Sequence, residues 1–162
     1  LFELIHPGRM VPAKSALPRF SQVAFAMQMP HLDLHKEFPG ADETELQERA
    51  AYAKRWLAKY APEKFVFKLH DSLPDAAKGL SIVQKKALQE ILRHIVVLPA
   101  MPDGEELHQF LHGLKEGVPI APAELFSAIY LAFLGKPMGP KAGWFLSVLP
   151  RDYVERQLRS VL

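Results

Sequence analysis

Helix start signals recur along this chain, and each is followed by apolar residues at helical spacing. Asp42 with Glu45 and Ser81 with Gln84 are typical of capping boxes, and Asp103 is a suitable N-cap residue for the segment after it. Prolines between these segments end one helix or start the next. The pattern therefore predicts an all-α chain of roughly seven short helices. The apolar stripes behind this prediction are Phe20, Val23, Ala24 and Met27; Leu46, Ala50, Ala53, Leu57 and Tyr60; Leu88, Ile91, Leu92, Ile95 and Val96; Leu107, Phe110, Leu111 and Leu114; Leu125, Ile129, Ala132 and Phe133; and Val154, Leu158 and Val161.

One segment does not follow the helical spacing. Residues 65–70, FVFKLH, alternate large apolar side chains with other residues, which is typical of a short extended segment lying across helices. Residues 71–80 contain a proline and a glycine and read as a loop. We therefore expect two helical subdomains, one over residues 1–72 and one over residues 73–162.

Composition bounds the possible partners and the chemistry. The chain of 162 residues has no cysteine, which excludes disulfide bonds and thiolate metal sites within it and fits a reducing cytoplasm. A net charge of +2 permits an acidic partner such as nucleic acid without demanding one. No apolar run approaches the about 18 residues of a membrane span, so no membrane role is expected. The chain begins with Leu1, and we expect it to be a piece of a longer protein.

Histidine pairs are the first candidates for a metal site. His108 and His112 have the i, i+4 spacing that can ligate zinc on a helix, as do His31 and His35. The metalloprotease motif also needs glutamate after the first histidine, where Gln109 stands. We interpret both pairs as solvated side chains. No glycine-rich phosphate loop or local nucleophile–base motif is present, so neither a catalytic centre nor a metal site is expected in this chain.

The segment FLGKPMGPKAGWFLSVLP, residues 133–150, is expected to form a corner between two helices. Gly135 stands where a helix C-terminus favours a left-handed residue. Gly139 with Pro140 is typical of the entry to a new helix, with the proline in its first turn. This corner contains the best candidate binding groups of the chain.

The candidate binding groups of the corner lie at the start of its second helix. Backbone amides near Lys141 and Ala142, with the Lys141 charge, are suited to accept a phosphate. Trp144 is suited either to stack on a base or to fill the core. Gly143 costs helix stability relative to alanine, which close helix packing or close approach of a ligand would explain.

The positive charge of the chain gathers at its C-terminal end. Residues 136–162 hold five cations and two acids, five minus two giving +3. Two arginines have i, i+4 acidic partners, Asp152 with Arg156 and Glu155 with Arg159. The pattern leaves two interpretations open: a solvated helix face stabilised by ion pairs, or a face that contacts RNA. The five cations are Lys136, Lys141, Arg151, Arg156 and Arg159.

The segment Glu124–Leu158 resembles the carboxy-terminal part of class I lysyl-tRNA synthetases. The likeness is carried by AIYLAFLGK, GPKAGWFL and DYVERQL, and more loosely by DGEELHQFLH, by RAAYAKRWLAKYAPEKFVFKL and by LPRFSQVAFAM. Glutamyl-tRNA synthetases share a distant version of this tail, often with leucine-glycine where this chain has Leu149-Pro150. The resemblance therefore favours the lysyl family and keeps the glutamyl one as an alternative.

The resemblance implies a fold, a partner and a division of labour. The chain would be an α-helix cage that holds the anticodon loop of the lysine tRNA, in a cytoplasmic ligase that joins lysine to that tRNA using ATP. Catalysis would belong to an upstream domain with HIGH and KMSKS motifs, neither of which occurs here, so ATP would bind there and this part would need no cofactor. The candidate tRNA contacts are Lys136, Gly139, Lys141, Ala142, Trp144, Arg151, Arg156 and Arg159. The alternative from another class is a helical protein-interaction domain without an RNA role.

Overall fold

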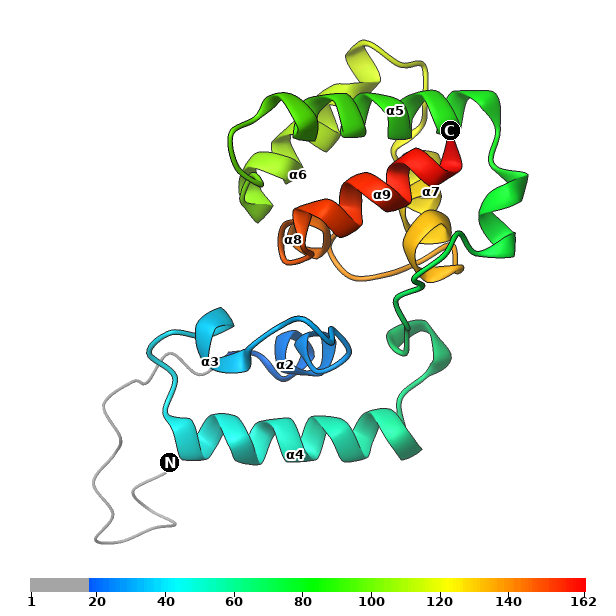
Figure 1. The fold of residues 1–162 in the computed structure, drawn as a ribbon. Helices are drawn as coiled ribbons and strands as arrows, with labels where there is room; N and C mark the ends of the chain where they lie inside the picture. The colour runs from blue at the N-terminus through cyan, green and yellow to red at the C-terminus, as the bar shows by residue number, and fades with distance from the viewer. Residues whose placement is uncertain (1–17) are drawn as a thin grey trace, which may run out of the picture.

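Eight α-helices form most of the chain in this computed structural model, which describes residues 18–162 (Figure 1). No β-strand occurs among these residues, so the all-α prediction is confirmed. The sequence missed α3, because a helix of one turn has too few positions to show a periodic pattern. The α-helices are α2 (Phe20–Ala26), α3 (Leu34–Glu37), α4 (Glu43–Lys59), α5 (Ile82–Val97), α6 (Gly104–Gly113), α7 (Pro122–Leu134), α8 (Ala142–Ser147) and α9 (Arg151–Val161), and short 3-10 turns are η1 (Glu63–Phe65), η2 (Asp75–Gly79) and η3 (Leu114–Glu116).

The predicted helix caps are present. The Asp42 carboxylate accepts a hydrogen bond from the Glu45 amide at 3.0 Å. Ser81 and Gln84 form a reciprocal capping box at the start of α5, and Asp103 forms one with Glu106 at the start of α6. These bonds satisfy amides that a helix N-terminus leaves without an intrahelical partner, so α4, α5 and α6 begin where the sequence predicted.

The helices α2, α3 and α4 form one unit with a small core of its own (Figure 1). Val23 and Ala24 of α2 pack there against Leu46 and Ala53 of α4. The predicted stripe of α4 was wrong at its end, because Tyr60 is 72% exposed and the ring that packs against this core is Trp56.

The helices α5 to α9 surround a larger core (Figure 1). Phe133 of α7 and Phe145 of α8 are fully buried there, with ring centroids 5.9 Å apart and planes at 90°. The buried Gln157 of α9 donates from Nε2 to the carbonyl of Ala132 at 2.8 Å. Among residues 18–162, no helix is both long and apolar enough to cross a membrane.

The segment after η1 lies across the helices without becoming a strand, as the alternation predicted. The Phe67 amide donates to Gln28 of the first unit at 2.8 Å, and the His70 amide donates to the Phe133 carbonyl at 3.2 Å. The Tyr153 hydroxyl donates to the His70 carbonyl at 2.7 Å. This segment therefore joins both units through backbone hydrogen bonds. A subdomain boundary between residues 72 and 73 stays a prediction, and residues 1–17 of the first subdomain lie outside the described residues.

Candidate nucleic-acid interface

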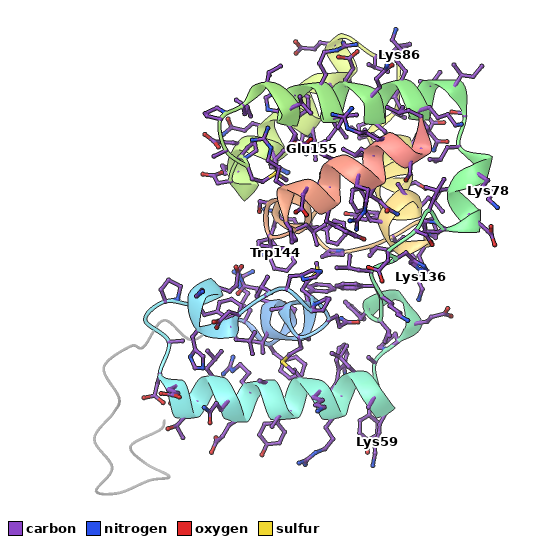
Figure 2. All side chains as sticks on the ribbon, viewed as in Figure 1. Lys59, Lys78, Lys86, Lys136, Trp144 and Glu155 are labelled. Atoms are coloured by element: carbon purple, nitrogen blue, oxygen red, sulfur yellow. The ribbon has the colours of Figure 1, made fainter. Side chains whose placement is uncertain are left out.

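A cleft of about 470 Å³ opens between the first unit and α8, and two of the candidate residues line it. Lys141 and Trp144 line one wall of the cleft, and Figure 2 shows the place of Trp144. Phe25 and Glu37 contribute to the other wall, from α2 and α3. The cleft therefore brings together an aromatic ring, a cation and a carboxylate from segments that are far apart in the sequence.

The corner between α7 and α8 is held tightly against α7. Gly135 ends α7 with φ of 65°, the left-handed conformation that the sequence predicted. At Gly139 a Cβ atom would stand 2.6 Å from the Tyr130 ring, so only glycine fits this approach. The Tyr130 hydroxyl donates to the Pro140 carbonyl, and burial raises the pKa of Tyr130 to about 12. The candidate Gly139 thus serves packing of the loop against α7.

The position of α8 depends on a second close approach, to α6. A Cβ atom at Gly143 would stand 2.5 Å from the Gly104 carbonyl oxygen and 2.8 Å from the His108 nitrogen. The sequence left open whether helix packing or a ligand explains this glycine, and the contact lies with the α6 backbone. This contact with α6 fixes the position of α8 and therefore the position of Trp144 at the cleft.

Trp144 is half-buried and joins the two units. Its indole Nε1–H donates to a carboxylate oxygen of Glu37 at 2.7 Å, a bond between residues 107 positions apart. The ring also packs against the larger core. The sequence offered core filling and base stacking as alternatives for Trp144, and the ring both touches the core and borders open space.

The change Trp144→Phe is expected to lower the free energy of unfolding by about 1 kcal/mol, because it removes a hydrogen bond to a charged group that is only partly shielded from water. Phenylalanine retains much of the ring packing, so the two units should keep their folds. Urea unfolding of Trp144→Phe, Glu37→Ala and the double variant measures the coupling between the two side chains, because alanine removes the acceptor as phenylalanine removes the donor. Purely additive losses would mean that the bond adds nothing to stability.

The helix α8 starts two residues later than the sequence predicted, so Pro140 lies outside its first turn. Pro140 precedes the N-cap residue Lys141, and the first helical residue is Ala142. Ala142 is buried, whereas the Lys141 side chain is exposed at the mouth of the cleft. Lys141 is therefore the accessible group of this pair.

Two other candidates are engaged inside the protein. Lys136 donates from Nζ to the Val66 carbonyl at 2.9 Å and lies 3.7 Å from the Glu63 carboxylate, across from η1 (Figure 2). Arg151 donates to the last carbonyls of α5, at 2.9 Å for Leu98 and 3.0 Å for Ile95. These side chains tie their segments to neighbouring elements and stand apart from the cleft residues.

The remaining candidates lie on α9 and are exposed. The Arg156 guanidinium stands 5.4 Å from the centroid of the Tyr153 ring. Arg159 lies 3.8 Å from Glu155, the pair that the sequence predicted, and Glu155 also accepts from Arg151 at 2.8 Å. Both Arg156 and Arg159 present charge at the surface, where it adds to long-range attraction of anions.

Sequence reasoning missed the far wall of the cleft. Glu37 and Phe38 come from one turn of the first unit, and Glu105 and His108 come from α6. No spacing pattern connects these residues with Trp144, so no local signal could have assigned them to one site. Within residues 18–162, no three histidine, aspartate or glutamate side chains gather where a metal ion could bind.

The chain is similar to archaeal lysine–tRNA ligases and matches no known family profile. The lysine–tRNA ligase of Thermoplasma volcanium is 35% identical over 122 residues, which are 75% of this chain and 23% of that protein. The lysine–tRNA ligase of Methanosarcina barkeri is 34% identical over 135 residues, 74% of this chain and 25% of that protein. That of Methanopyrus kandleri is 28% identical over 132 residues, 82% of this chain and 23% of that protein. The chain thus spans about a quarter of the length of these relatives.

Proposed function

From the relationship to lysine–tRNA ligases over three quarters of the chain, we propose that this protein is the tRNA-binding part of such an enzyme. In this proposal the chain binds the anticodon loop of the lysine tRNA, while an upstream domain attaches lysine at the expense of ATP. These archaeal relatives are all lysine–tRNA ligases, which supports the lysyl over the glutamyl alternative.

The observation that carries the anticodon role is the meeting of Lys141 and Trp144 at one cleft, within the segment that resembles the synthetase tail. Proteins that read RNA sequence hold unpaired bases, stack them on rings and bond their edges. Lysine anticodons carry two uridines, and a uridine edge offers two carbonyl acceptors and one N–H donor. The Lys141 ammonium donates to such a carbonyl, and a carboxylate such as that of Glu105 accepts from the N–H. The mixed charge of the cleft suits base edges better than phosphates.

Cations outside the cleft supply a separate contribution. Arg156 and Arg159 on α9 are exposed and suited to attract the RNA backbone without reading its sequence. Their contribution should weaken as salt increases, because phosphate contacts release counterions. Edge contacts in the cleft should depend less on salt.

The proposal predicts that the chain binds the anticodon stem-loop of a lysine tRNA at least tenfold tighter than one with both uridines changed to cytidine. Fluorescence anisotropy at two salt concentrations measures both dissociation constants, and tenfold corresponds to about 1.4 kcal/mol. Lys141→Ala should reduce this ratio. Lys86→Ala, which removes an exposed lysine of α5 away from the cleft, is the matched control and should leave it unchanged (Figure 2).

Three results separate specific recognition from simple charge attraction. Equal binding of both loops that disappears with salt would mean that only phosphates are contacted. A preference that Lys141→Ala leaves intact would place recognition outside the cleft. No binding of either loop at low salt would contradict an independent tRNA-binding role for this chain.

A further inference from the structure

A second surface combines exposed aromatic rings with cations, and it lies on α4, away from the cleft. Tyr52 is 63% exposed, Tyr60 is 72% exposed and Phe20 of α2 is 38% exposed. Tyr52 lies within α4, and Tyr60 is the residue directly after its last helical residue, eight positions later, which corresponds to roughly 12 Å along the helix axis. Exposed large rings are ordinary when scattered, but here they border one hollow of about 680 Å³.

The floor of this hollow is rigid. Trp56 lies between the two tyrosines on the helix and lines the same hollow. Its ring meets the Phe20 ring edge-on, with ring centroids 5.6 Å apart, and its centroid lies 5.7 Å from that of the Phe65 ring. A ring held on two sides keeps its exposed edge in place, so a flat ligand would meet a preformed surface.

The charge of α4 is divided along its length. Its acidic residues, Glu43, Glu45 and Glu48, fall within the first six positions. Residues 49–60 carry four cations and no acid, in a chain whose net charge is +2. Arg49 is engaged with the Pro18 carbonyl at 2.7 Å, whereas Arg55 stands 5.9 Å from the centroid of the Tyr52 ring.

Two exposed cations flank the exposed rings. They are Arg55 and Lys59, and Lys59 projects at the far end of α4 (Figure 2). The second half of α4 therefore alternates rings that are suited to stacking with charges that are suited to phosphates. Aromatic rings interleaved with cations are typical of surfaces that bind single-stranded nucleic acid.

We propose that this face of α4 binds unpaired nucleotides of RNA, with bases stacked on Tyr52 and Tyr60 and phosphates beside Arg55 and Lys59. The inference rests on the proposed tRNA-binding function and adds a second contact surface to it. Every base has a face that stacks, so the surface contributes affinity without reading sequence. Glu45 and Glu48 line the end of the hollow towards the start of α4, whereas residues 49–60 at its other end carry four cations and no acid, which favours a polyanion over a protein partner at that end.

The test compares two double variants of the whole chain binding a full-length lysine tRNA transcript. Tyr52→Leu with Tyr60→Leu keeps apolar bulk but removes the rings, and its dissociation constant should rise at least tenfold. Tyr52→Phe with Tyr60→Phe keeps the rings and should stay within twofold of the unchanged chain. Both tyrosines are exposed, so circular dichroism should show the same helix content and melting temperature in both variants.

A second measurement addresses the phosphates independently. Changing Arg55 and Lys59 to glutamine should reduce the slope of log K against log salt by about 1 for each phosphate that these side chains no longer neutralise. These changes should leave unaltered the ratio of the dissociation constants for the lysine stem-loop and its cytidine counterpart, because the surface does not read sequence.

The outcomes separate this inference from the anticodon role. Loss of affinity in the leucine variant without any anticodon preference in the unchanged chain would support the α4 surface and contradict anticodon reading. A folded leucine variant whose dissociation constant stays within twofold overturns the α4 surface while leaving anticodon reading intact. Absence of any RNA binding also overturns it. The same holds if a bound protein partner covers this face of α4 and the affinity of the chain for RNA does not change.

Discussion

The change Gly143→Ala is expected to lower the free energy of unfolding by about 3 kcal/mol, the upper end of what overpacking in a well-packed interior costs. The added Cβ would meet the Gly104 carbonyl oxygen at 2.5 Å and the His108 nitrogen at 2.8 Å. Both are backbone atoms of α6 and cannot rotate away as a side chain would. Thermal unfolding should show a melting temperature lower by roughly 6 to 12 °C.

Gly113→Ala is the matched control for this change. Gly113 is the last residue of α6, and apart from its chain neighbours and its own helix backbone no atom lies within 4 Å of the position that its Cβ would take. Alanine is a better helix former than glycine, so this variant should be unchanged or more stable by up to about 1 kcal/mol. An unchanged melting temperature for Gly143→Ala would mean that α8 can move away from α6 at little cost.

The change Gly143→Ala also tests whether the contact between α8 and α6 positions the residues of the cleft. Moving α8 away from α6 displaces Trp144 relative to Glu37, whose carboxylate lies 2.7 Å from the indole nitrogen. The proposed anticodon preference should therefore decline in Gly143→Ala even at temperatures where the protein stays folded. The tRNA contacts proposed for α4 should persist, because α4 packs against α2 in the other unit.

Local rules account for most of what the sequence predicted correctly. A capping residue such as Ser81 acts on amides within three residues, and the left-handed Gly135 ends the helix directly before it. Helix period and cap chemistry are therefore visible in any window of the sequence. The apolar stripe of α4 failed at Tyr60 because spacing alone does not say which of two neighbouring rings, Trp56 or Tyr60, faces the core.

The candidate site depended on contacts that no window contains. Trp144 meets Glu37 across 107 positions, and Arg151 meets Ile95 across 56. Sequence reasoning grouped five C-terminal cations by their nearness in the chain. The folded chain directs Lys136 towards η1, Arg151 towards α5 and Lys141 towards the cleft. The tertiary packing of the helices determines which partners these side chains meet. The helical period of the sequence does not specify this packing.

The change Arg151→Ala is expected to lower the free energy of unfolding by about 2 to 3 kcal/mol, because it leaves helix-end carbonyls without a charged donor. The guanidinium donates to Leu98 at 2.9 Å, to Ile95 at 3.0 Å and to Glu155 at 2.8 Å. Arg151→Lys should recover only part of the loss, since an ammonium lacks the fork that reaches several acceptors together. Urea unfolding measures each variant.

Arg156→Ala is the control on the same helix, and it should cost less than about 1 kcal/mol because the Arg156 side chain is exposed over the Tyr153 ring. If Arg151 serves the fold, Arg151→Ala protein that remains folded at low temperature should keep its dissociation constant for the lysine tRNA. A stable Arg151→Ala variant that binds the tRNA at least tenfold more weakly would instead make Arg151 an RNA contact, the role that the sequence alone predicted for it.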